Sequence, residues 1–221
     1  KPYLIGLAGG QGTGKTTISS ILKIILTKYF KLNVFKISID DLYKTRKDRI
    51  KLSEKIHPLL MTRGVPGTHD VNFIFDLLKK TKGKRFNQQR LPKFNKAIDD
   101  RLKRKSWYLV KKVPDVIIFE GWCVGARAEK NATLKKSINS LERTADKNLR
   151  WRKYVNGQLQ TKYKKLFSKL DCLLFLKAGS FRLLQNWRLK QEALLKLNSK
   201  NKANSKVMSK NEVLTFMQTY Q

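Results

Sequence analysis

Gly9-Gly10-Gln11-Gly12-Thr13-Gly14-Lys15-Thr16 is the stretch that decides the fold of this chain. It fits the pattern Gly-x-x-x-x-Gly-Lys-Ser/Thr in full. Apolar residues fill positions 3–8 before it, as in a buried parallel strand, and others follow it at helical spacing (Ile18, Ile21, Leu22, Ile25 and Leu26). This order of strand, loop and helix is the context that a phosphate-binding P-loop requires.

The glycines of this loop predict what it binds. They permit positive φ angles and close approach, so successive backbone N–H groups can point at one anion beside the positive end of a helix. We therefore expect residues 9–17, ending in Thr17, to hold the phosphates of ATP. Lys15 is expected to reach the β and γ phosphates, and the Thr16 hydroxyl to ligate Mg²⁺.

Length and composition bound the class of protein. The 221 residues fit one α/β domain with a sizeable core, so we expect a single domain over 1–221. No apolar run approaches the ~20 residues that cross a bilayer, and the first residues lack a secretory pattern. The sequence predicts a cytoplasmic protein without a membrane partner, or an organellar one if a leading peptide precedes these residues. Cys123 and Cys172 lack metal-ligand spacing.

The formal charge of +33 favours polyanions in general. A specific nucleic-acid function would add basic residues gathered on one face, or a recognisable helix-turn-helix, zinc-finger or RNA-recognition module. None of these modules is present, and lysines occur in nearly every polar segment. The sequence therefore predicts a basic surface without a specific nucleic-acid partner.

A second strand is predicted over 33–39, and two acids follow it directly. Carboxylates at the carboxyl end of a strand fall at the edge where α/β sheets bind their ligands. Asp40 is therefore a candidate base or orienting group for a substrate hydroxyl, although an acid here can also cap the next segment. Asp41 is its alternative, and Tyr43, three residues after Asp40, is a further candidate for binding the substrate.

Residues 44–112 form a basic, irregular region that we expect to contribute to the substrate site or a lid. Within it, residues 63–70 read as a structured loop because they contain two glycines and an internal proline. Arg63, His69 and Asp70 stand in this loop, where a substrate-binding role is plausible, while a structural role for His69 stays equally open. Thr68 or Asp70 is expected to cap a helix beginning near residue 71.

A third strand is predicted over 115–119 and ends in Glu120. Four apolar residues followed by an acid describe a central parallel strand of the Walker B type, with Glu in place of the commoner Asp. We expect Glu120 to face the magnesium ion. The alternative is an acid that stands at a strand end without a catalytic role.

The last predicted elements are a strand and a helix. Residues 171–176 are continuously apolar after the first acid and predict another buried strand. Ser180 is expected to cap a helix near 180–195 that serves as a lid. Arg188, rather than Arg182, is the favoured cation for the transferring phosphate. Together these elements predict a three-layer α/β P-loop NTPase fold, with a mainly parallel sheet and helices on both faces.

Three segments resemble one family of metabolite kinases. Ser38-Ile39-Asp40-Asp41-Leu42-Tyr43 resembles a motif shared by pantothenate kinase, uridine kinase and phosphoribulokinase, in which the first Asp acts as base. Arg63-Gly64-Val65-Pro66-Gly67-Thr68-His69-Asp70 is similar to the Arg-Gly-x-Pro-Gly-Thr-His-Asp of the D-glycerate 3-kinase family, and Phe119-Glu120-Gly121-Trp122 matches its Phe-Glu-Gly-Trp. The resemblance covers most of the chain.

This resemblance implies an ATP- and Mg²⁺-dependent kinase of a small hydroxy acid, with D-glycerate as the first candidate. Asp40 would orient the acceptor hydroxyl and Arg63 would bind its carboxylate, while Lys15, Glu120 and Arg188 would serve the phosphate and metal. The chain departs from the family pattern at Asn95 and Ala97, where an acid and a hydroxyl are usual. Alternatives are a pantothenate-kinase-like or uridine-kinase-like enzyme, and a nucleic-acid-associated ATPase.

Overall fold

The computed structural model describes residues 1–82, 86–198 and 208–221 of the chain. The strands are β1 (Tyr3–Gly9), β2 (Val34–Ser38), β3 (Gln89–Leu91), β4 (Phe94–Asn95), β5 (Asp100–Arg101), β6 (Tyr108–Val110), β7 (Val116–Gly121) and β8 (Cys172–Leu176). The α-helices are α1 (Lys15–Lys28), α2 (Arg46–Lys55), α3 (Asn72–Lys80), α4 (Ser140–Ala145), α5 (Arg150–Gln158), α6 (Lys164–Phe167), α7 (Phe181–Asn198) and α8 (Lys210–Met217).

Short helical turns connect these elements at several places. The 3₁₀ turns include η1 (Ile39–Leu42), η2 (Pro58–Met61), η3 (Arg104–Ser106), η4 (Thr133–Lys135) and η6 (Gln218–Tyr220), and a π-helical turn, η5 (Leu159–Tyr163), joins α5 to α6. Turn η1 follows directly on β2, and η6 extends α8.

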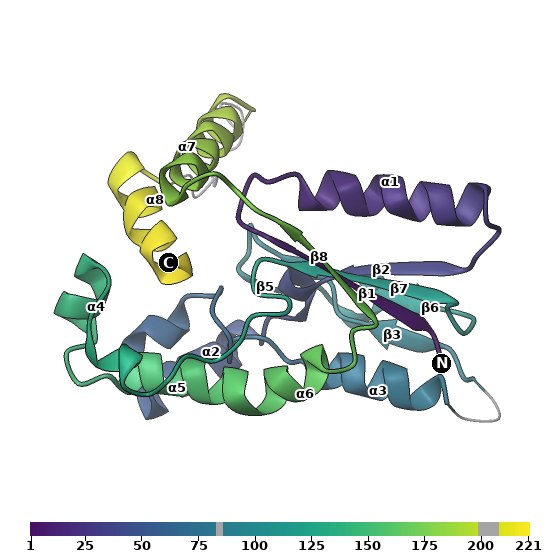
Figure 1. Ribbon diagram of the computed structural model, residues 1–221, viewed down its shortest axis with the longest axis horizontal. Helices are drawn as coiled ribbons and strands as arrows, with labels where there is room; N and C mark the ends of the chain where they lie inside the picture. Colours follow the sequence, from purple (N-terminus) through teal and green to yellow (C-terminus); the bar gives the residue numbers. More distant parts are fainter. Residues whose placement is uncertain (83–85, 199–207) are drawn as a thin grey trace.

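The central sheet has the strand order β2-β7-β1-β8. All of its neighbouring pairs are parallel. Helix α1 covers one face, and α3, α5 and α6 lie on the other (Figure 1). The prediction of a three-layer α/β fold with a parallel sheet is therefore confirmed.

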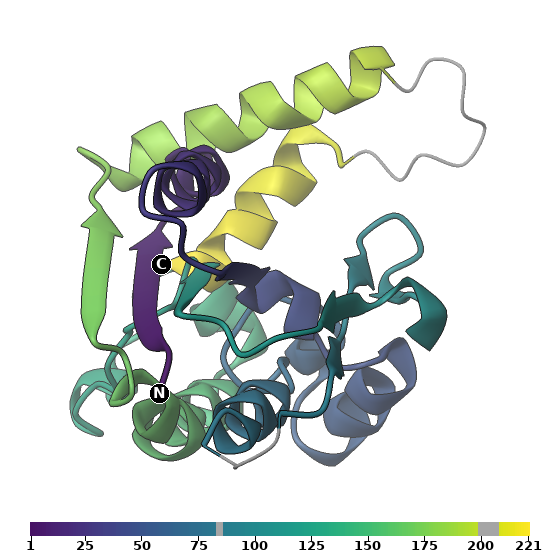
Figure 2. The ribbon, with the colours of Figure 1, turned by 90° about the vertical axis from the view of Figure 1, so that its right-hand side faces the viewer.

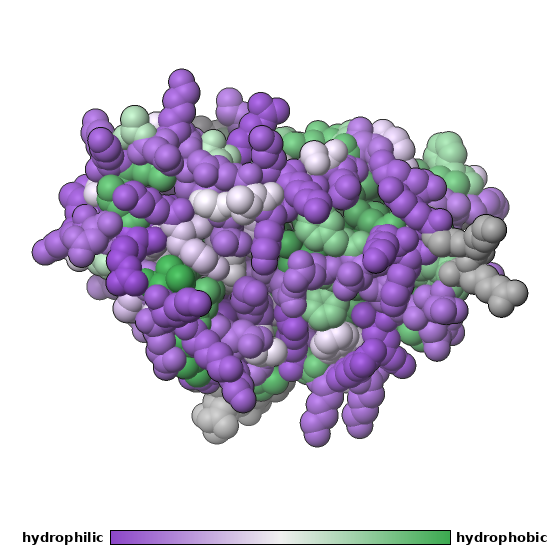
Figure 3. All heavy atoms as spheres, turned by 90° about the horizontal axis from the view of Figure 1, so that it is seen from below, coloured by the Kyte–Doolittle hydropathy of each residue, from purple (hydrophilic) through white to green (hydrophobic). Residues whose placement is uncertain are grey.

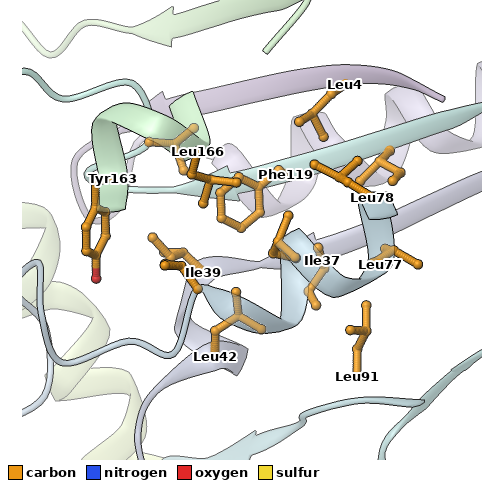
Figure 4. Packing of buried hydrophobic residues seen from close by; sticks show 14 of the residues in the cluster. Leu4, Ile37, Ile39, Leu42, Leu77, Leu78, Leu91, Phe119, Tyr163 and Leu166 are labelled. Carbon is orange, nitrogen blue, oxygen red and sulfur yellow. The ribbon is translucent and has the colours of Figure 1, made fainter. Parts of the chain in front are cut away.

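Two apolar clusters attach the helices to the sheet. The larger one fills the space between the sheet and the layer of α3 and α6 (Figure 4), and its buried members include Leu4, Ile37, Leu77, Phe119 and Leu166. The smaller one lies under α1, where Val34, Val116 and Ile118 contact Leu22 and Leu26. Strand β7 contributes to both, because its residues alternate between the two faces and every one is buried.

Strand β8 differs from the prediction of a buried strand. It is an edge strand that pairs with β1, and Leu173, Leu174 and Phe175 expose 45%, 41% and 65% of their surface. The prediction of burial from the apolar run was wrong, because an apolar run of this kind can form either a central strand or an edge strand. On α1, Ile18, Ile21 and Ile25 are likewise exposed, so only part of its apolar set faces the sheet.

The region 44–112 combines α2, α3 and two small antiparallel pairs, β3 with β6 and β4 with β5. Helix α3 begins at Asn72 without a side-chain cap, so the prediction of a Thr68 or Asp70 cap is wrong. The Thr68 hydroxyl instead donates to the Val65 carbonyl at 2.7 Å. It serves the turn of the loop rather than the helix.

Helices α7 and α8 lie beyond the carboxyl ends of the sheet strands, and Figure 2 shows α8 passing beneath α7 toward the interior. Ser180 accepts a hydrogen bond from the backbone of Leu183 at 3.2 Å, which confirms the expected cap at the start of α7. Ser209 and Glu212 form a complete capping box on α8. Within the described residues, no helix is long and apolar enough to cross a membrane.

Candidate active site

Parallel pairing brings three loops together at one edge of the sheet. Strand β7 lies between β2 and β1, and Glu120 is in register with Ser38 on one side and Leu7 on the other. The loop that follows β1 and the turn that follows β2 therefore flank Glu120. This is the edge at which ligands bind in open α/β sheets.

The P-loop has the backbone geometry that its glycines permit. Gly9, Gly12 and Gly14 have φ angles of +153°, +81° and +84°. A Cβ on Gly12 would lie 2.7 Å from the Cβ of Trp187, and one on Gly10 would lie 2.6 Å from Leu184. Helix α7 thus packs directly on the loop, and glycine is required there for close approach as well as for conformation.

Lys15 lies against the loop that it follows. Its Nζ donates to the Gly10 carbonyl at 2.7 Å, and the Thr13 hydroxyl donates to the same oxygen at 2.8 Å. Burial lowers the pKa of Lys15, and the negative charges of Glu120 and Asp40 oppose that shift. The Lys15 ammonium is therefore bonded to the P-loop and lies within range of the charges of both candidate acids.

Thr16 and Glu120 are the two groups expected to hold a metal, and Thr17 follows Thr16 in the phosphate-binding loop. Thr16 and Thr17 are exposed in the first turn of α1, whereas Glu120 is only 6% exposed. Burial raises the pKa of Glu120, opposed by a hydrogen bond from Ser38 and the charge of Lys15. An acid in such a place suits a cation or a metal-bound water.

The donor set fits magnesium better than a tightly caged metal. In the described parts of the chain, no group of three His, Cys, Asp or Glu side chains could hold an ion. Mg²⁺ in kinase sites is bound through one or two protein oxygens together with substrate phosphates and water. The Thr16 hydroxyl and the Glu120 carboxylate are of that kind.

Asp40 stands at the same edge in turn η1. Its Oδ1 accepts from the Tyr43 hydroxyl at 2.9 Å, and its Oδ2 accepts from Lys96 Nζ at 2.7 Å. Burial acts to raise the pKa of Asp40, but the charge and hydrogen bond of Lys96 outweigh it and bring the pKa below its ordinary value. Asp40 is therefore ionised and partly open, as a hydroxyl-orienting group must be.

Asp41 has different surroundings. Its Oδ1 accepts from the backbone of Phe94 and its Oδ2 from the Tyr108 hydroxyl, each at 3.2 Å. These bonds tie β4 and β6 to η1. Asp41 thus has a structural role in this region, whereas the charge that acts on the P-loop lysine is that of Asp40.

His69 is buried at 3% exposure and forms one side of a polar chain. The Gly67 backbone donates to the Tyr163 oxygen at 2.9 Å, and that oxygen lies 2.8 Å from His69 Nδ1. The phenol hydrogen has an acceptor only if Tyr163 donates to Nδ1. Burial lowers the pKa of His69 to about 4, so the imidazole is neutral and carries its proton on Nε2.

The His69 Nε2 is buried without a hydrogen-bond partner in the described structure. The ring stacks on Tyr43 with centroids 4.5 Å apart, and Tyr43 in turn donates to Asp40. An unpaired buried donor costs about 1–3 kcal/mol. Beside Asp40, such a donor is ready for a ligand that brings an acceptor oxygen.

Two predicted substrate-binding residues already hold ion pairs. Arg63 Nη1 pairs with Asp99, whose other oxygen pairs with the fully buried Arg49 at 2.9 Å. Asp70 Oδ2 lies 3.6 Å from Arg101 Nη2. These pairs fix the loop 63–70 against the β4–β5 hairpin.

Arg188 of α7 pairs with Glu192 one turn later at 2.6 Å. Its Nε is buried without a partner in the described structure, and Glu192 Oε1 accepts from the backbone of Met208 at 2.9 Å. Glu192 therefore links the arginine to the segment that leads into α8. Arg182, in contrast, is exposed near the start of α7.

Known proteins resemble the chain over almost its whole length, although no family model matches it. It is 32% identical over 228 residues to an uncharacterized kinase of Schizosaccharomyces pombe, covering all of this chain and 79% of that protein. It is 27% identical to the chloroplastic D-glycerate 3-kinase of Arabidopsis thaliana, covering 99% of this chain but 46% of the relative. The solved D-glycerate 3-kinase of Cryptococcus neoformans var. grubii superposes with a TM-score of 0.83 at 27% identity, covering 99% and 76% of the two chains.

The chain belongs to the D-glycerate 3-kinase family of P-loop kinases. Membership places it among kinases that use ATP. Two groups in the site of this kinase were not singled out from the sequence. The first is Lys96, which pairs with Asp40. It lies in the segment Asn95-Lys96-Ala97, whose departure from the family pattern was the one sequence feature that could have drawn attention to it.

Asp99 is the second group that sequence reasoning missed. It adopts φ +54° and joins the kinase's Arg63 to Arg49, whose guanidinium also donates to the carbonyls of Met61 and Asp99. No local pattern marks a residue whose partners lie 36 and 50 positions away. Its role depends on the tertiary fold.

Proposed function

We propose that this kinase transfers the γ-phosphoryl group of ATP to a hydroxyl of a small hydroxy acid, D-glycerate first, in a reaction that needs Mg²⁺. The observation that carries the proposal is the placement of Asp40. Its carboxylate is ionised at the P-loop edge, within the field of Lys15 and beside the buried donor of His69. The proposal takes residues 1–221 as one kinase domain, with 44–112 and α7 as its substrate and lid parts.

On the donor side, residues 9–17 would cradle the phosphates through their backbone N–H groups. Lys15 would exchange its bond to the Gly10 carbonyl for the β and γ phosphates. Arg188 would approach the transferring group, because α7 already packs on Gly10 and Gly12 through Leu184 and Trp187. Positioning and charge neutralisation are what phosphoryl transfer mainly requires.

Thr16 and Glu120 would hold the magnesium ion, directly or through water. An ion held there would supply positive charge against the phosphates during transfer. Burial raises the pKa of Glu120, and a nearby cation would lower it again by stabilising the ionised carboxylate. The hydrogen bond from Ser38 and the charge of Lys15 favour the same ionised form.

On the acceptor side, the substrate hydroxyl would attack the γ phosphorus while the bond to the β–γ bridging oxygen breaks and ADP leaves. Asp40 would accept the proton of that hydroxyl. His69 Nε2 would donate to an acceptor oxygen, and Tyr43 would hold Asp40 in orientation. General acid–base groups of this kind contribute about 100- to 10,000-fold.

Arg63 would bind the acceptor carboxylate. One of its nitrogens pairs with Asp99, and a guanidinium has five N–H donors in a planar fork. Asp70 would act through Arg101, whose Nε donates to the Tyr43 carbonyl at 2.7 Å. The substitutions at Asn95 and Ala97 fall on this side of the site, so they bear on the choice of acid and not on the phosphates.

A coupled assay of ADP release tests the proposal across D-glycerate, other short hydroxy acids, pantothenate and nucleosides. We expect D-glycerate to give the highest kcat/KM, and chelation of magnesium to abolish turnover. A preference for pantothenate or a nucleoside would replace the acceptor. Hydrolysis of ATP that polynucleotides stimulate, without any acceptor being phosphorylated, would replace the kinase activity itself.

The same proposal leaves the +33 charge without a specific nucleic-acid partner. Hydrophilic side chains are spread over the face shown in Figure 3 rather than gathered in one patch. Retention on DNA or RNA should therefore vanish between low and physiological salt.

We propose the cytoplasm as the compartment, with an organelle as the alternative because one relative is named chloroplastic. Imaging of the tagged full-length protein decides between them.

A further inference from the structure

Helix α8 and the turn that follows it reach the acceptor side of the site. Val213 and Met217 of α8 are buried, and turn η6 continues the helix inward. Gln218 fixes this turn to α4, since its Oε1 accepts from the Ser140 hydroxyl at 2.9 Å and the Leu141 backbone at 2.8 Å. Tyr220, two residues later, is therefore held against the rest of the fold by these bonds.

Tyr220 packs on two aromatic rings. Its ring meets Trp122 edge-to-face with centroids 4.6 Å apart and Phe216 with centroids 5.1 Å apart. Trp122 Nε1 donates to the Gly64 carbonyl at 2.8 Å. The ring of Tyr220 is thus held between the strand that carries Glu120 and the loop that carries Arg63.

The Tyr220 hydroxyl lies close to the backbone of that loop. A Cβ on Gly64 would be 2.9 Å from the hydroxyl oxygen, and Gly64 has φ +142°. Glycine at this position therefore admits the phenol as well as the backbone angle. Any side chain there would displace the hydroxyl from the site.

Three charges of the site act on this hydroxyl. Burial raises the pKa of Tyr220, and the charge of Asp40 raises it further. The charges of Arg63 and Arg188 oppose this shift without reversing it, so the phenol is neutral. These three residues are the proposed proton acceptor, carboxylate ligand and phosphate ligand. Gln218 and Trp122 form hydrogen bonds that hold the residues around Tyr220 in position. Among the hydrogen bonds between described residues, none near η6 involves the Tyr220 hydroxyl itself.

We propose that Tyr220 is an acceptor-binding residue, whose hydroxyl hydrogen-bonds to the hydroxyl of the hydroxy acid that does not react. This inference rests on the proposed function and adds to it a specificity determinant from α8. A neutral phenol suits a neutral hydroxyl, while the carboxylate of the acid is left to Arg63. A site built to bond a substrate hydroxyl discriminates against analogues that lack it.

The test compares Tyr220→Phe with the wild-type enzyme, using the acceptor that gives the highest kcat/KM. Phe keeps the ring contacts with Trp122 and Phe216, so folding is preserved and circular dichroism should not change. We expect the acceptor KM to rise about tenfold, with the KM of ATP changed less than about twofold. Tyr29→Phe is the matched control, because Tyr29 is 79% exposed at the end of α1 and should leave both constants unchanged.

A second acceptor identifies the contact. With an analogue that lacks the non-reacting hydroxyl, such as 3-hydroxypropanoate in place of D-glycerate, Tyr220→Phe should match the wild-type enzyme. An unchanged acceptor KM, an equal rise for ATP, or an equal loss with both acceptors would overturn the inference while the kinase activity stands. Absence of turnover with every hydroxy acid in the wild-type enzyme would reject the proposed function, and this inference with it.

Discussion

The buried imidazole of His69 should make the stability of this kinase depend on pH. Burial holds its pKa at about 4 in the folded protein, against 6.5 for an exposed histidine. The unfolded chain therefore binds a proton below pH 6.5 that the folded protein does not take up until about pH 4. The free energy of unfolding should fall as pH drops through this window, by about 2 kcal/mol at pH 5.

Urea unfolding of the wild-type protein and of His69→Gln, each at about pH 7 and pH 5, measures this contribution. Gln does not titrate, and every other group is common to the two proteins. The wild-type protein should therefore lose about 2 kcal/mol more than the variant between the two pH values. Identical losses would show that His69 is protonated in the folded protein, and would remove the Nε2 donor from the argument.

His57→Gln serves as the control for this comparison. His57 lies away from the cluster, with its ring 3.0 Å from the Ala145 carbonyl. His57→Gln should behave like the wild-type protein, so between about pH 7 and pH 5 it should lose more free energy of unfolding than His69→Gln does. If His57→Gln lost no more free energy of unfolding than His69→Gln, the pH dependence could not be assigned to His69.

Changes at other positions separate catalysis from stability. Lys15→Ala should lower kcat about a hundredfold or more without changing the circular dichroism spectrum, and normal turnover would exclude Lys15 from phosphate binding. Asp40→Asn should lower kcat by about a hundredfold or more, whereas a larger loss in Asp41→Asn would reverse their roles. Arg49→Met should lower the free energy of unfolding by about 3 kcal/mol, because it removes the buried partner of Asp99; urea unfolding measures this, and a loss below about 1 kcal/mol would contradict it.

The sequence was sufficient to place the main groups of the site at one edge. An apolar run followed by an acid, repeated before Asp40 and Glu120, predicts two parallel strands whose ends meet. The glycine pattern of the P-loop supplied the third strand. These inferences depend on local order and on the rule that parallel strands share their carboxyl edge, so they did not need distant contacts.

Burial and pairing could not be read in the same way. The apolar run of β8 would be identical in a central strand, and only its place beside β1 makes it an edge. Lys96 and Tyr220 reach the site through hairpin and helix packing, across 56 positions in the case of Lys96 and Asp40. Charge pairs of this kind follow from the tertiary arrangement alone.

The edge position of β8 has a consequence for the behaviour of the protein in solution. In the described residues, one side of this strand pairs with β1 and the other presents its backbone amides and carbonyls next to exposed Leu174 and Phe175. Such an edge is a template for a strand of another molecule. Mutual repulsion between copies of charge +33 opposes that encounter, and its range shrinks to about 8 Å at physiological ionic strength. For residues 1–221 by themselves, resistance to aggregation therefore depends on the basic side chains, and added salt should promote aggregation.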